Sequence, residues 1–167
     1  MKVETFDKKY DRAMFECSNT ELTQYLKTRL SQDIKRNACR GFVILDDVVI
    51  KGYYTLSSDK IPNKDIPKEM RKKFPPGYDM PVTLLGRLAI DKTLSGQGYG
   101  GELLMNALIK AYLTSYTIAS TAIVTDPIDG QAKSFYEHYG FIELPDSKRM
   151  ALPFSTLEKV FKDSKNK

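Results

Sequence analysis

Four glycines lie within six residues near the middle of the chain, shortly after an apolar run at 82–90. They are Gly96, Gly98, Gly100 and Gly101. Glycine is a poor residue with which to begin a helix, but it lets a ligand approach the backbone closely. A strand, a glycine-rich turn and a helix N-terminus together present free N–H groups and the positive end of the helix dipole, which suits an anion such as a phosphate. A tight turn without a ligand would use the same residues, so glycine content alone leaves both interpretations open.

The spacing of these glycines excludes one of the two commonest phosphate-binding loops. No Gly-Lys-Ser/Thr triplet follows them, so the segment is not a P-loop. Counted from Gly98, the dinucleotide fingerprint GxGxxG fails because Leu103 stands at its last glycine, but counted from Gly96 the glycines at 96, 98 and 101 match it, and such a glycine pattern alone is weak evidence.

The elements around the glycines form a strand–turn–helix unit. The run VTLLGRLAI at 82–90 predicts a mostly buried strand. A helical pattern opens at Gly98, and its apolar residues recur at i, i+1, i+4, i+5, i+8 and i+9, which predicts one broad buried face. These apolar residues are Leu103, Leu104, Ala107, Leu108, Ala111 and Tyr112.

The other predicted elements alternate between strands and helices, which indicates an α/β domain on a mixed sheet. Asn19 precedes a helical pattern of apolar residues that continues to Arg36. Gly140 is expected to end a helix in the left-handed conformation. The remaining predictions are strands at 3–6, 42–45, 48–56, 118–127, 141–143 and 149–152, a helix from 132, a helix from 154, and an irregular segment at 57–81 with a short helix at 67–73.

Two segments carry a family resemblance. Ser95-Gly96-Gln97-Gly98-Tyr99-Gly100 resembles motif A of the GNAT acetyltransferases, (Q/R)-x-x-G-x-(G/A), and AKSFYEHYGFIEL at 132–144 resembles their motif B. Ser95 departs from the usual Gln or Arg, so one side-chain contact to a pyrophosphate is either missing or supplied by Gln97. The resemblance implies the GNAT fold, with about six to seven strands, flanking helices and two splayed strands around an acetyl-CoA site.

The resemblance also implies roles for individual residues. Tyr136 occupies the family's general-acid position, and the backbone N–H near Leu88 is placed to stabilise an oxyanion. A tyrosine at helical spacing can equally be a packing residue, as we expect for Tyr139, and His138 is expected at the surface. The residues implied to bind acetyl-CoA are Leu88, Ala89, Ile90, Ser95, Gly96, Gln97, Gly98, Tyr99, Gly100, Gly101 and Phe135.

No dedicated general base stands out. An α-amine with a pKa near 7.7–8 is largely neutral at physiological pH, whereas a lysine amine near 10.4 is not, so the missing base favours an α-amine acceptor. The alternative is that a water relay to Glu102 or Asp126 removes the proton from the acceptor amine.

The net charge of +5 is unevenly placed. Residues 27–40 and 60–73 each carry a net charge of +4, which leaves the rest of the chain slightly acidic. Such groups are often only a solvated face, but two of them favour a polyanionic partner. The candidate nucleic-acid-binding residues are Arg36, Arg40, Lys68, Arg71, Lys72 and Lys73.

The order of motifs over nearly the whole chain is similar to the GNAT toxins of bacterial toxin–antitoxin pairs. That resemblance implies acetylation of the α-amine of aminoacyl-tRNA, a homodimer, and a small antitoxin of ribbon-helix-helix type. Two alternatives remain: a GNAT enzyme acting on a small amine, a polyamine or a protein N-terminus, and a non-catalytic module that senses acyl-CoA or binds RNA.

The length and composition of the chain predict its domain number, the state of its cysteines and its location. With 167 residues, the chain is expected to form a single domain over 1–167. Cys17 and Cys39 predict neither a disulfide framework nor a zinc site. The N-terminal residues lack a hydrophobic stretch and no apolar run is long enough to span a membrane, so we expect a cytoplasmic protein.

Overall fold

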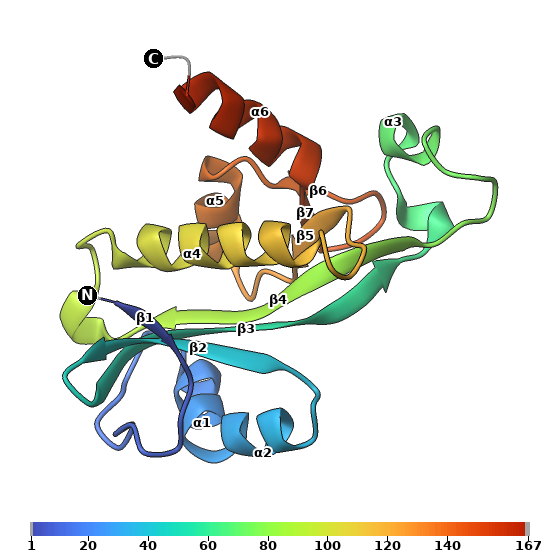
Figure 1. Cartoon of the computed structure of the whole chain (residues 1–167). Helices are drawn as coiled ribbons and strands as arrows, with labels where there is room; N and C mark the ends of the chain where they lie inside the picture. The colour runs from blue at the N-terminus through green and yellow to red at the C-terminus, as the bar shows by residue number, and fades with distance from the viewer. Residues whose placement is uncertain (1, 166–167) are drawn as a thin grey trace. The chain divides into compact units, whose positions relative to one another are not determined.

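The computed structural model describes residues 2–165 and contains one seven-stranded sheet (Figure 1). The order of its strands is β1-β2-β3-β4-β5-β7-β6. The strands are β1 (Val3–Thr5), β2 (Arg40–Asp46), β3 (Val49–Ile61), β4 (Met80–Ile90), β5 (Ala122–Thr125), β6 (Ile142–Glu143) and β7 (Met150–Pro153). The helices are α1 (Thr20–Thr28), α2 (Leu30–Lys35), α3 (Lys68–Arg71), α4 (Tyr99–Thr114), α5 (Gly130–His138) and α6 (Phe154–Lys165).

The chain divides into two compact units. Unit 1 contains the residues up to Ser57 together with Leu85–Lys110, and unit 2 contains Ser58–Leu84 and the residues from Ala111 onward. The expectation of a single domain over 1–167 remains a prediction.

In unit 1, helices cover both faces of β2 and β3, and two consecutive tyrosines of β3 each contact a helix on a different face. Successive side chains of a strand point to opposite faces. Tyr53 donates a hydrogen bond to the carbonyl of Leu22 in α1, at 2.7 Å, whereas Tyr54 donates to the side chain of Asn106 in α4, also at 2.7 Å. Both rings are completely buried, and desolvation by burial raises the pKa of each hydroxyl. The apolar face predicted for α4 is confirmed here, since Leu103, Leu104 and Ala107 are fully buried.

Unit 2 has its own core around β5 and β7, which pair antiparallel. A buried cluster includes Val82, Ala122 and Val124, together with Leu144 and Ala151. The aromatic ring of Tyr112, at the end of α4, packs against Phe154 and Phe161 of α6 at 5.8 and 6.0 Å between ring centroids.

Three predicted boundaries are wrong. The strand expected at 118–127 is shorter, because β5 contains only Ala122–Thr125 and the side chain of Ile118 is 66% exposed. The helix expected to continue to Arg36 is divided at Arg29, which ends α1 and precedes α2. The segment 57–81 is not irregular throughout, because β3 continues to Ile61 and β4 begins at Met80. Residues 57–60 are polar but alternate between half-buried and exposed, which is the pattern of a strand with one solvated face.

Other predicted elements are confirmed. The hairpin, the strand at 82–90 and the helix after the glycines are present, and Gly140 follows α5 with a φ of 89°.

Two further findings concern the cysteines and the helices. Cys17 and Cys39 are free cysteines. Within residues 2–165, no helix is long and apolar enough to cross a membrane.

Candidate active site

The glycine loop, residues 95–101, has the backbone geometry of an anion site. Gly96 and Gly98 have φ angles of 74° and 86°, in the left-handed region that favours glycine. A Cβ atom at either position would meet nothing within 4 Å, so it is the backbone conformation, and not crowding by neighbouring atoms, that requires these glycines.

The start of α4 leaves donors free. Gly101 and Glu102 both donate their N–H groups to the carbonyl of Gly98, at 3.0 and 3.2 Å. The N–H groups of Gly98, Tyr99 and Gly100 have no acceptor within residues 2–165. Three consecutive free donors at the positive end of a sixteen-residue helix fit a diphosphate, so this loop can hold the pyrophosphate of a nucleotide cofactor.

The side chains beside the motif A position contribute less than the backbone. Ser95 and Gln97 are exposed. Gln97 donates its side-chain amide N–H to the carbonyl of Thr93 at 2.9 Å, which braces the loop internally. An anion at this loop would therefore meet mainly main-chain N–H groups.

The end of β4 lies closely against β3. A Cβ at Gly52 would lie 2.7 Å from Cδ1 of Ile90 and 3.3 Å from the carbonyl oxygen of Ala89, so a larger residue at this position would require the Ile90 side chain to move. Ala89 is buried, whereas Leu88 and Ile90 are half-buried. These two side chains remain partly accessible, as residues along a cofactor arm would be.

Tyr136 lies on α5 in unit 2 and is 7% exposed. Asp129 caps the helix by accepting a hydrogen bond from the N–H of Ala132 at 2.7 Å. The ring of Tyr136 contacts the rings of Phe135 and Phe141, at 5.3 and 5.2 Å between centroids. Desolvation by burial raises the pKa of Tyr136, and a hydrogen bond with the side chain of Thr125 opposes that rise. The hydroxyl is therefore protonated at neutral pH, as a general acid must be.

The neighbours of Tyr136 on α5 differ from it in exposure. Tyr139 is half-buried and packs against Phe135 at 5.1 Å between centroids. His138 is exposed, as expected.

Asp126, one of the carboxylates considered for a water relay, is held in an ion pair. Nε of Arg149 lies 3.0 Å from Oδ1 of Asp126, and Nη2 of Arg149 lies 2.6 Å from Oδ2 of Asp59. Sequence reasoning missed Arg149 and Asp59, because they are 90 residues apart and no local pattern links them. Glu102, the other candidate, is exposed on α4.

The six basic candidates do not have equivalent surroundings. Arg36 and Arg40 of unit 1 are exposed, as are Lys68, Lys72 and Lys73 of unit 2. Arg71 is half-buried, and its Nη2 donates to the carbonyls of Lys64 and Ile66, at 2.9 Å each. Arg71 therefore stabilises its own loop.

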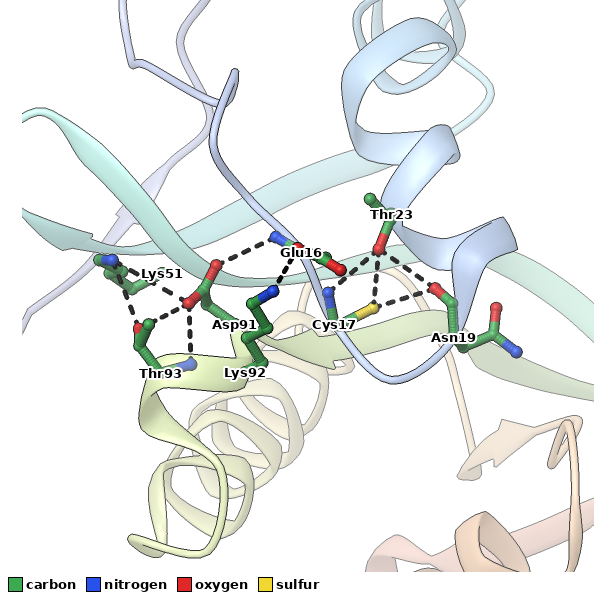
Figure 2. A network of polar contacts seen from close by, with 8 residues as sticks. All are labelled: Glu16, Cys17, Asn19, Thr23, Lys51, Asp91, Lys92 and Thr93. Atoms are coloured by element: carbon green, nitrogen blue, oxygen red, sulfur yellow. Dashed lines mark hydrogen bonds and ion pairs between the residues drawn. The ribbon is translucent and has the colours of Figure 1, made fainter.

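The sequence did not indicate a role for Asp91, although this residue lies between β4 and the glycine loop. It is 3% exposed and forms the centre of the polar network in Figure 2. Its Oδ1 accepts from the N–H and the hydroxyl of Thr93, and its Oδ2 accepts from the N–H of Glu16 at 3.0 Å. Nζ of Lys51 lies 4.0 Å from Oδ1. An Asp two residues before Thr is a local capping signal, but the bond to Glu16 spans 75 residues.

The fold, the glycine loop and the helix that carries Tyr136 define an acyltransferase of the GNAT class. The model of the acetyltransferase (GNAT) family matches residues 4–141, and the chain belongs to that family. The GNAT fold expected from the two motifs is thereby confirmed.

Three proteins are similar to this chain over 78% or more of its length. A tRNA-acetylating toxin of Mycobacterium tuberculosis (strain ATCC 25618 / H37Rv) is 30% identical over 131 residues, which cover 78% of this chain and 78% of the toxin. The crystal structure of a tyrosine-to-phenylalanine mutant of KacT has a TM-score of 0.88 and 30% identity, and the match covers 95% of this chain and 98% of KacT.

The third relative is AtaT. Its complex with acetyl-methionyl-tRNAfMet has a TM-score of 0.88 and 27% identity, and the match covers 96% of this chain and 98% of AtaT. A tyrosine-to-phenylalanine mutant of the same toxin has been solved with acetyl-CoA and the C-terminus of the antitoxin AtaR, with a TM-score of 0.82, 25% identity and coverage of 96% and 97%.

Proposed function

We propose that this protein transfers the acetyl group of acetyl-CoA to the α-amine of an aminoacyl-tRNA and thereby inhibits translation as a toxin. The observation that carries the proposal is the glycine loop, whose three free N–H groups suit the pyrophosphate of CoA. Family membership supports the acetyl transfer, and the similarity to a tRNA-acetylating toxin and to tRNA-bound AtaT supports the acceptor.

Acetyl-CoA supplies an activated thioester when it is bound. The N–H groups of Gly98, Tyr99 and Gly100 would hold its pyrophosphate, and Gly96 and Gly101 would shape the loop around them. The remaining candidates would line the cofactor and are Leu88, Ala89, Ile90, Ser95, Gln97 and Phe135. The N–H of Leu88 would stabilise the oxyanion that develops during transfer.

Tyr136 would act as the general acid. Its buried hydroxyl keeps its proton at neutral pH and can give it to the departing CoA thiolate. The negative charge that then develops on the phenol oxygen would be stabilised by the hydrogen bond with Thr125.

The acceptor would be attracted by the exposed basic side chains. Arg36 and Arg40 in one unit, and Lys68, Lys72 and Lys73 in the other, can contact phosphates. An α-amine needs no strong base at neutral pH, because much of it is already unprotonated. Arg71 belongs to this set only indirectly, since its guanidinium holds the carbonyls of its own loop.

We also propose a homodimer and an antitoxin partner of ribbon-helix-helix type. The complex of AtaT with the C-terminus of AtaR supports a partner that restrains the enzyme. Charged tRNA is a cytoplasmic substrate, so the proposed reaction would take place in the cytoplasm.

Labelled acetyl-CoA with a pool of charged tRNAs tests the function directly. Deacylated tRNA and spermidine run in parallel, and the triple variant Arg36→Glu, Lys72→Glu, Lys73→Glu serves as the acceptor-surface control. We expect label on charged tRNA, lost in the triple variant while CoA binding is retained. Label on spermidine alone would instead identify a small-amine acetyltransferase, and CoA binding without any transfer would identify a sensing module.

A further inference from the structure

A pocket of about 430 Å³ lies within unit 1, between the segment at 13–17 and the first turns of α1. Residues of α1 that line it are Thr20, Thr23, Gln24 and Lys27. Their hydroxyl, amide and ammonium groups can contact a polar ligand, and Glu16 adds a carboxylate to the opposite wall. On the other wall, the side chain of Met14 is 80% exposed.

Two consecutive backbone N–H groups of the 13–17 segment bond in different directions, one to Asp91 outside the pocket and the next to α1 in the opposite wall. The N–H of Glu16 donates to Oδ2 of Asp91 at 3.0 Å, and the next one, of Cys17, donates to Oγ1 of Thr23 at 3.1 Å. Thr23 is buried in α1 and donates its hydroxyl to the carbonyl of Asn19, the residue that caps this helix. Figure 2 shows the resulting chain of contacts, which runs from Asp91 through the 13–17 segment to α1.

The main chain of the two segments is joined as well. The N–H of Lys92 donates to the carbonyl of Glu16 at 2.7 Å, and the N–H of Asp91 donates to the carbonyl of Lys51 at 2.8 Å. Asp91 therefore lies where β3, the 13–17 segment and the start of the glycine loop meet.

The two carboxylate oxygens of Asp91 serve different segments. Oδ1 receives the N–H and hydroxyl of Thr93, which shapes the 3₁₀ turn Lys92–Leu94 that leads into the glycine loop. Oδ2 receives the N–H of Glu16 in the pocket wall. A carboxylate accepts on both sides, whereas an amide accepts on one side only.

We propose that Asp91 is a positioning residue that holds the pocket wall in register with the glycine loop, one oxygen serving each. The inference rests on the proposed function, because the pocket wall affects the kinetics only if the acceptor lies against it. Asp91 touches neither the cofactor nor the acceptor in this proposal; it acts through Glu16 and Thr93.

Three variants separate the two sides of the carboxylate. In Asp91→Asn, the amide oxygen faces the two donors of Thr93, and the amide N–H₂ is left facing the N–H of Glu16. Thr93→Val removes the two bonds of the Thr93 hydroxyl, to Oδ1 of Asp91 and from Nζ of Lys51, and leaves the bond between Asp91 and Glu16 in place. Lys92→Met is the matched control, since it removes only an exposed ion pair with Glu16, whose side chains are 62% and 58% exposed.

The measurements are the KM and kcat for charged tRNA and the Kd for CoA, obtained by calorimetry without any acceptor. We expect Asp91→Asn to lower kcat/KM for the acceptor about ten- to hundredfold, with the Kd for CoA changed less than about threefold. Thr93→Val should weaken CoA binding by about threefold to tenfold and leave the KM for the acceptor unchanged. Lys92→Met should change neither.

Two results would overturn the inference: Asp91→Asn behaving like Lys92→Met, or the acceptor KM and the CoA Kd rising together by one factor, as a general loss of structure would produce. If circular dichroism shows that Asp91→Asn does not fold, Thr93→Val provides the test: the Kd for CoA must rise while the KM for the acceptor stays unchanged. A wild-type protein that does not acetylate charged tRNA refutes the proposed function instead, and the CoA measurement still tests the loop side of Asp91.

Discussion

Replacing Tyr136 with phenylalanine removes one oxygen atom and keeps the ring contacts with Phe135 and Phe141. The cost in stability is then limited to the hydrogen bond with Thr125, about 1 kcal/mol. Loss of a general acid should lower kcat about 10²- to 10⁴-fold. This variant should therefore lose most of its kcat while its stability changes little.

The assay is a steady-state measurement of acetyl transfer to charged tRNA, with thermal unfolding and calorimetric CoA binding on the same samples. Tyr139→Phe is the matched control, because this tyrosine lies three residues further along and also packs on Phe135. We expect a normal kcat in the control and a normal Kd for CoA in both variants. Equal kcat values for Tyr136→Phe and wild type would refute the general-acid role.

The pH dependence gives an independent check on Tyr136. Its pKa is raised above the ordinary value of 10.0 by burial, so the reactive, protonated form persists through neutral pH. The unfolded chain ionises first as the pH rises, so the same burial stabilises the fold fully below pH 10 and less above it. A fall in wild-type kcat between pH 6 and 8 that tracks tyrosine ionisation would contradict this environment.

Three further predictions follow from other parts of the structure. Gly98→Ala should weaken CoA binding by roughly tenfold in calorimetry, because its φ of 86° strains any residue with a Cβ and the free N–H groups begin at this position. Arg149→Met should lower the unfolding free energy by about 1–2 kcal/mol in urea titrations, because it leaves Asp59 and Asp126 unpaired at a partly exposed site; Lys60→Met, which breaks a more exposed pair, should cost less than half of that. The KM for charged tRNA should rise steeply with salt between about 50 and 200 mM, whereas a salt-independent KM would argue against phosphate contacts by the basic side chains.

Local sequence determined the elements whose signals lie within a few residues. The apolar run at 82–90 predicted β4, and apolar residues at helical spacing predicted the buried face of α4. Asn19 and Gly140 marked helix ends, because capping depends on neighbouring backbone groups. The glycine loop belongs to this class too. The left-handed φ angles of Gly96 and Gly98 are a property of the residue type, and the free donors are a property of any helix N-terminus.

Tertiary structure decided what depends on residues far apart in the chain. The polar residues 57–60 of β3 resembled a loop in sequence, and their alternation of half-buried and exposed side chains is explained only by their place in the sheet. Asp91 and Arg149 are ordinary charged residues in their local context. Their roles arise from partners 75 and 90 residues away, and no spacing rule reports such partners. Sequence thus determined which backbone could bind an anion, because that is a local property, whereas the fold decided which carboxylates are buried and what they hold.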